Sequence, residues 1–109
     1  MTYESAIALI EGRYGEESQL IQTAEECAEL AKAAIKRYRV LAAQAPCSES
    51  LAASRAALIE EIADVLIMID QIVYIEDFEK DVWKMVDLKI ERQLERIRGN
   101  EHDTKTNLA

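Results

Sequence analysis

Apolar residues recur along this chain at steps of three and four, the spacing that gathers them on one face of an α-helix. Over about residues 16–44 such a row is formed by Leu20, Ala24, Cys27, Ala31, Ala34, Ile35 and Tyr38. A second row, in about residues 78–98, is formed by Val82, Met85, Val86, Ile90 and Leu94. Between them, residues 51–75 are apolar nearly all round from Ile62 to Ile69. This pattern predicts three long helices, the middle one buried on every side.

Capping and helix-breaking residues set the predicted ends. A short first helix over about 4–11 has Thr2 as its N-cap and ends at Gly12 and Gly15. Pro46 stops the second helix, and Ser48 or Ser50 caps the third. Glu76 and Asp77 mark a break and a new N-cap, and Gly99-Asn100 ends the fourth helix. The chain is therefore expected to form four helices and a polar tail.

Length and composition support one all-α domain. The chain has 109 residues, and three glycines with one proline leave few turns for an all-β fold. We expect a helical bundle of four main helices over residues 1–99, followed by a disordered tail over 100–109. The apolar character of 62–69 exceeds what a small bundle can cover. A homo-oligomer, either a dimer or a tetramer, is expected to cover the remaining face.

The charge and the cysteines narrow the class of partner. A formal net charge of −8 argues against nucleic acid or an anionic membrane as the main partner. A nucleotide is not excluded, because bound metal ions reverse the local field. Cys27 and Cys47 lack metal-ligand spacing and are read as reduced thiols. With no signal-peptide pattern at the N-terminus and no apolar stretch long enough to cross a bilayer, we expect a cytoplasmic protein.

Two pairs of acids carry the candidate chemistry. Glu26 and Glu29 are three residues apart on one predicted helix, and Glu61 and Asp64 repeat that spacing on the next. Antiparallel packing of the two helices would bring the four carboxylates together. Taken alone, the first pair reads as a solvated acidic face. The second pair lies within an apolar stripe and needs a partner, either a Lys or Arg or a cation, because burying an unpaired carboxylate is costly.

A hard divalent cation is the interpretation that reconciles four converging carboxylates, which would otherwise repel one another. Mg²⁺ takes oxygen ligands and is completed by water and substrate phosphates. The one histidine, His102, lies in the tail, so the Glu-x-x-His pairs of a di-iron bundle and the usual ligands of a zinc site are missing. The sequence therefore predicts Mg²⁺, with Mn²⁺ as a substitute.

The run Glu25-Glu26-x-x-Glu29, followed by Glu61-x-x-Asp64, resembles the EExxE…ExxD signature of the MazG-like nucleoside triphosphate pyrophosphohydrolases, over roughly residues 20–94. The resemblance implies an all-α oligomer that converts a (d)NTP to (d)NMP and pyrophosphate with Mg²⁺, in a role such as cleansing the nucleotide pool. It also implies that the metal ligands are Glu26, Glu29, Glu61 and Asp64. The 31-residue gap from Leu30 to Glu60 is long for that family.

Three further residues receive roles from the same resemblance, each beside a structural alternative. Glu25 would orient or deprotonate the attacking water, or it is a surface acid. Lys89 and Arg92 would hold the triphosphate, or they belong to a solvated, ion-paired face. Gln93 stands where some relatives have another basic residue. Two rival functions remain open: a non-enzymatic helical interaction or regulatory module and, ranked lower, a phosphoribosyl-ATP pyrophosphohydrolase.

Overall fold

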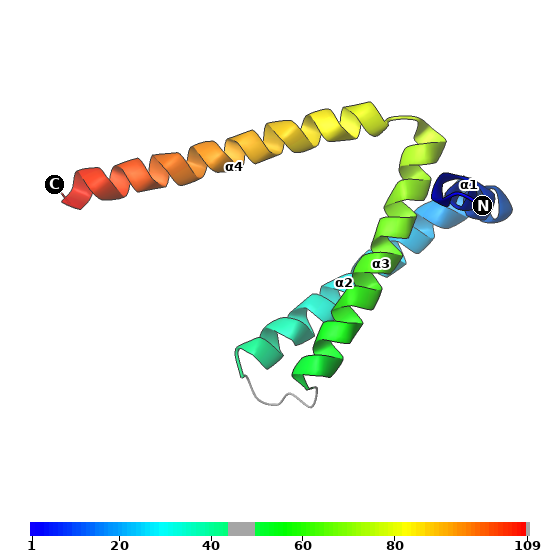
Figure 1. Ribbon diagram of the computed structural model, residues 1–109, viewed down its shortest axis with the longest axis horizontal. Helices are drawn as coiled ribbons and strands as arrows, with labels where there is room; N and C mark the ends of the chain where they lie inside the picture. Colours follow the sequence, from blue (N-terminus) through cyan, green and yellow to red (C-terminus); the bar gives the residue numbers. More distant parts are fainter. Residues whose placement is uncertain (44–49, 109) are drawn as a thin grey trace. The chain divides into compact units, whose positions relative to one another are not determined.

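The computed structural model describes the backbone of residues 1–43 and 50–108 and the side chains of 1–43 and 50–100. Within these residues the chain is all-helical, with no strand (Figure 1). The four helices are α1 (Tyr3–Tyr14), α2 (Glu16–Leu41), α3 (Leu51–Glu76) and α4 (Glu79–Leu108). None of them, over the described ranges, is both long and apolar enough to cross a membrane. The predicted all-α class is confirmed.

The structure consists of two parts, residues 1–77 and 78–109, and each is described by itself. The first part contains α1, α2 and α3, and the second contains α4. The division of the chain into a domain over 1–99 and a tail over 100–109 stays a prediction.

The start of α1 follows the predicted cap, but its end does not. The hydroxyl of Thr2 accepts a hydrogen bond from the backbone amide of Ser5 at 3.0 Å. The helix passes through Gly12 and stops at Gly15, whose φ of 90° is a conformation that side chains rarely adopt. Gly15 alone therefore ends the helix, and the backbone turns there directly into α2.

Helices α2 and α3 lie side by side and antiparallel (Figure 1). Near the connecting loop, the Arg37 guanidinium on α2 donates to the Leu51 carbonyl at 2.9 Å and to the Ser54 hydroxyl at 3.1 Å. At the opposite end, the amide of Gln19 donates to that of Gln71 at 2.5 Å, with both side chains buried. The two helices are thus joined by polar contacts at both ends.

The buried apolar residues of this part lie where its helices meet. They are Ile7, Ala33, Val65 and Met68. Helix α1 is held against α3 in addition by the Tyr3 hydroxyl, which donates a hydrogen bond to the Asp70 carboxylate. The predicted helical hairpin of the second and third segments is therefore present, with α1 packed on α3.

The helix faces that meet within the single chain differ from the rows that hydrophobicity marks. The apolar row of α2, which includes Leu20, Cys27 and Tyr38, is exposed, and a more polar face containing Gln19 and Ala33 meets α3. On α3, Val65 and Met68 are buried, whereas Ile62 and Leu66 remain 43% and 53% exposed. The physical reason is that α2 covers one side of α3 only, so a helix that is apolar all round keeps an uncovered side.

The boundaries around α3 and α4 differ partly from those expected. Ser50 caps α3, since its hydroxyl accepts from the Ala53 amide at 3.0 Å, while Pro46 and Ser48 lie outside the described residues. Asp77 ends α3 in the left-handed region, at φ 53°, rather than capping α4. Helix α4 continues through Gly99 instead of ending there, because one glycine costs a helix only about 1 kcal/mol.

Candidate metal centre

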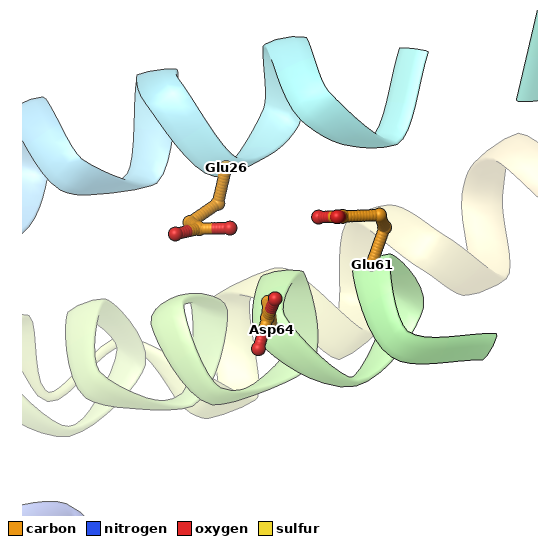
Figure 2. Close-up of side chains that lie close together, drawn as sticks. All are labelled: Glu26, Glu61 and Asp64. Carbon is orange, nitrogen blue, oxygen red and sulfur yellow. The ribbon is translucent and has the colours of Figure 1, made fainter. Parts of the chain in front are cut away.

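Three carboxylates from α2 and α3 lie close together, and Figure 2 shows those of Glu26 and Glu61 between the two helices, with Asp64 beside them on α3. Glu26 comes from α2, and Glu61 and Asp64 come from α3. One carboxylate oxygen from each residue lies within 4.8 Å of the other two. Two oxygens on opposite sides of a bound Mg²⁺ are about 4.2 Å apart, twice the usual Mg–O distance. The bound of 4.8 Å is slightly wider than this separation, so the three residues form a candidate cation site whose side chains would have to move slightly closer to share one ion.

The positions of these side chains follow from helix geometry and one local hydrogen bond. Glu61 and Asp64 are three residues apart, so α3 presents both on neighbouring turns of the face that meets α2. On α2, the amide of Gln22 donates to Glu26 Oε1 at 2.9 Å across one helical turn. Gln22 thereby fixes one oxygen of Glu26 and leaves the other for a ligand.

Glu61 is the electrostatic centre of the cluster. Its Oε2 atom is buried and has no hydrogen-bond partner among the described residues. Desolvation of the carboxyl raises its pKa, and the nearby carboxylates of Asp64 and Glu26 raise it further. Smaller contributions in the same direction come from Glu29 and Glu60. The ionised form of Glu61 is therefore disfavoured unless a cation enters the cluster.

The donor set fits Mg²⁺ better than the softer metals. All available ligand atoms are carboxylate oxygens, the type preferred by hard divalent ions. No described lysine or arginine side chain is hydrogen-bonded or ion-paired to Glu26, Glu61 or Asp64 in the structure. The usual structural alternative, a cationic side chain that neutralises the acids, is thus not what holds this described cluster together.

The fourth predicted ligand, Glu29, lies outside the three-carboxylate cluster. Its Oε1 pairs with Lys32 Nζ at 3.4 Å, and about half of the Glu29 side chain is exposed. It is nonetheless near enough to raise the pKa of Glu61. Glu29 therefore contributes to the negative field of the site, and its role as a ligand stays a prediction.

The remaining predicted residues are exposed. Glu25 is exposed on α2, as its alternative interpretation as a surface acid requires. Lys89 and Arg92 are exposed on α4, in the second part of the structure. Their predicted roles in water activation and triphosphate binding stay predictions.

For Glu26, the interpretation as a solvated acidic face is wrong. Glu26 is half-buried and faces Glu61, because the polar face of α2, and not its apolar row, packs against α3. That face also contains Gln22, whose contact with Glu26 was not anticipated. The four-residue spacing of Gln22 and Glu26 could have indicated this contact, since side chains four apart on a helix are neighbours.

Comparison with models of protein families, with curated proteins and with solved structures gives no match for this chain. The family resemblance stated above therefore rests on the motif residues and stays a prediction.

Proposed function

We propose that the chain is a Mg²⁺-dependent nucleoside triphosphate pyrophosphohydrolase of the MazG-like type, which converts a (d)NTP to (d)NMP and pyrophosphate. The observation that carries the proposal is the meeting of Glu26 with Glu61 and Asp64 within 4.8 Å. The buried, unpartnered Oε2 of Glu61 supports it, because such an atom gains most from a cation. The order of the motif residues along two successive helices supplies the substrate class.

In the proposed reaction, water attacks the α-phosphorus of the triphosphate, the bond from that phosphorus to the bridging oxygen breaks, and pyrophosphate leaves. Bound Mg²⁺ would supply charge neutralisation for the phosphates and the leaving group. Glu26, Glu61 and Asp64 would hold the ion, and Gln22 would keep Glu26 in its orientation. Glu25 is the candidate acceptor of the proton lost by water, and Lys89 and Arg92 are the candidate phosphate contacts.

The proposal includes assembly as a homo-oligomer and action in the cytoplasm. Many large apolar side chains of α1, α2 and α3 are exposed in the single chain. Exposed apolar side chains that gather into a patch often mark sites of association. A second copy of the chain is therefore part of the proposed working protein.

The test is pyrophosphate release from the eight common ribo- and deoxyribonucleoside triphosphates, with and without Mg²⁺. Glu61→Gln and Asp64→Asn are expected to reduce the rate by at least about a hundredfold, as the loss of a metal ligand does. Glu60→Gln is the matched control, since Glu60 is an exposed acid next to Glu61. Unchanged turnover in both site variants, with a folded helical protein, would remove the proposal.

The exposed apolar side chains also favour a second candidate, a non-enzymatic helical interaction module. Thermal unfolding separates the two, because a ligand that binds only the native state raises the unfolding midpoint. The hydrolase is expected to unfold at a higher temperature with Mg²⁺ and a non-hydrolysable triphosphate. The module is expected to respond to neither.

A further inference from the structure

Helix α3 has a regular apolar row on the side that α2 leaves uncovered. The row follows steps of three and four residues, the spacing of a helix-pairing seam. Four of its side chains are 40–53% exposed and the last is half-buried. Its members are Ile59, Ile62, Leu66, Ile69 and Val73. The row is separate from Val65 and Met68, which face α2.

Helix α2 carries a second exposed row with the same alternation of three and four. Its large members, Leu20, Tyr38 and Leu41, are 45%, 60% and 63% exposed. Between them lie four smaller exposed residues, Ala24, Cys27, Ala31 and Ala34. Each helix of the hairpin therefore has one exposed apolar row that the other helix does not cover.

The two rows lie on one side of the hairpin. At 100° per residue, the row of α2 is turned about 110° from the residues that meet α3, and the row of α3 is turned about 140° from those that meet α2. Both rotations are measured in the sense in which the helix winds as residue numbers increase. Because the two helices run in opposite directions and face each other, equal senses of rotation bring both rows to the same side of the hairpin. Two helices side by side, each about 10 Å across, make this side about 20 Å wide, and the α3 row is about 20 Å long. The apolar side of the hairpin therefore has an area on the order of 400 Å².

The ends of this hairpin have opposite charge among the described residues. Near the loop, the last turns of α2 and the first turns of α3 contain the basic residues Lys36, Arg37, Arg39 and Arg55. At the other end, α2 begins with Glu16 and Glu17, and α3 ends with Glu76 followed by Asp77, beside Arg13 at the end of α1. The neighbouring carboxyl of Glu76 raises the pKa of Glu16. At this end the four acids named outnumber the one named cation, Arg13.

Opposite charges are also arranged evenly about the α3 row. Leu66 is its midpoint, since Ile59 and Val73 are each seven residues away. Arg55 lies eleven residues before Leu66 and Glu76 ten residues after it. In a two-fold, antiparallel pair of hairpins centred near Leu66, each Arg55 would come next to Glu76 of the other copy. A parallel pair would instead place equal charges together.

We propose that this side of the α2–α3 hairpin binds a second copy of the chain in an antiparallel, two-fold arrangement, with the basic loop end of each hairpin against the acidic end of the other. A two-fold contact uses the same surface on both copies, so it needs a face that is complementary to itself. An apolar centre with oppositely charged ends meets that need. The inference names the surface for the oligomer of the proposed function and does not depend on the hydrolysis.

The first test measures the molar mass of the full chain by sedimentation equilibrium over a range of concentrations. Wild type is expected to be a dimer, and Leu66→Glu is expected to raise the dissociation constant at least about a hundredfold, because it places two charges together in an apolar contact. Ile21→Glu is the matched control, since Ile21 is 65% exposed on α2 but lies outside the row. Circular dichroism verifies that each variant is helical.

The second test addresses the orientation. Arg55→Glu is expected to weaken the dimer about tenfold, because two attractive end contacts become repulsive, and adding Glu76→Arg is expected to restore it. A wild-type monomer overturns the proposal, as does a dimer unaffected by Leu66→Glu. A dimer insensitive to Arg55→Glu overturns the antiparallel arrangement. Pyrophosphate release is assayed in the same samples, so an inactive dimer contradicts the proposed hydrolysis and not this inference. An active monomer contradicts this inference and the proposed assembly, and not the hydrolysis.

Discussion

Glu61 of α3 and Glu26 of α2 share the space between the two helices, although they are thirty-five positions apart in the chain. Asp64 completes the group, and the buried Oε2 of Glu61 has no hydrogen-bond partner among the described residues. An arrangement of this kind stores electrostatic repulsion in the folded state. It is stable only to the extent that a proton or a cation offsets the negative charge.

The first prediction concerns stability against pH without metal. The folded pKa of Glu61 is raised, so the folded state binds its proton more tightly than the unfolded state. Stability is therefore expected to be higher below the ordinary Glu pKa, to fall as pH rises through the raised value, and to stay lower at neutral pH. Glu61→Gln, which carries no charge, is expected to be more stable than wild type at pH 7 and to lose much of this dependence. Urea unfolding between pH 4 and 8 measures it.

Two additions to this experiment make it specific. Glu60→Gln removes an exposed neighbouring charge and is expected to change the pH profile much less than Glu61→Gln, because Glu60 is the smallest of the contributions that raise the pKa of Glu61. Mg²⁺ is expected to stabilise wild type at pH 7 and to have a smaller effect on Glu61→Gln, because the ion offsets the same repulsion. A wild type whose stability rises steadily from pH 4 to 7 would contradict the raised pKa.

The second prediction concerns the buried amides that join α2 to α3. Gln71 is fully buried and accepts a hydrogen bond from Gln19 at 2.5 Å, and its own amide lies 3.4 Å from the Ile67 carbonyl. Gln71→Ala is expected to lower the free energy of unfolding by about 2–4 kcal/mol, because it leaves the Gln19 amide unpaired and opens a cavity.

The double variant provides the control for that experiment. Replacing both glutamines, as Gln19→Leu with Gln71→Leu, removes both polar groups together and is expected to cost less than either single change to leucine. Urea unfolding of the four proteins gives the coupling free energy. Strictly additive effects would show that the two amides do not support each other.

The third prediction compares two glycines near the end of α1. Gly15 has φ 90° and ψ 156°, a region almost restricted to glycine, so Gly15→Ala is expected to lower stability by about 1–3 kcal/mol. Gly12 is helical, and an added Cβ would meet nothing within 4 Å. Gly12→Ala is expected to raise stability by about 0.5–1 kcal/mol. Thermal unfolding of both variants measures the contrast, and equal effects would contradict it.

The sequence predicts the helices well and the helix faces less well. Periodicity and caps locate all four helices, and Thr2 and Ser50 are confirmed as caps. The contact between α2 and α3, however, is made by a more polar face of α2 that contains Gln19 and Glu26, while hydrophobicity points to the row with Cys27. A hydrophobic pattern marks residues that need burial, and it does not state whether the same chain or another copy buries them. The second copy proposed above would bury both rows.

The sequence likewise predicts only part of the candidate site. Three-residue spacing predicts that Glu61 and Asp64 act together, and the apolar stripe around them indicates that they need a partner. Sequence spacing alone does not distinguish Glu26 from Glu29 as the residue that meets them, because both are acids on neighbouring turns. The rotation of α2 about its axis decides it, and that rotation depends on contacts such as Arg37 with Ser54.

The last prediction tests which acids bind the metal. Asp64 belongs to the cluster, whereas Glu29 is paired with Lys32 at 3.4 Å and its side chain is about half exposed. Asp64→Asn is expected to weaken Mg²⁺ binding more than tenfold, since a ligand is lost. If Glu29 acts only through its field, Glu29→Gln is expected to weaken binding at most about fivefold, because a charge about 8 Å from a divalent ion in water contributes about 1 kcal/mol. Calorimetric titration with Mg²⁺ at low and at physiological salt separates the two effects, because screening reduces a field effect but not the loss of a ligand. A decrease for Glu29→Gln as large as that for Asp64→Asn, and unchanged by salt, would make Glu29 the fourth ligand, with Lys32 displaced when the ion binds.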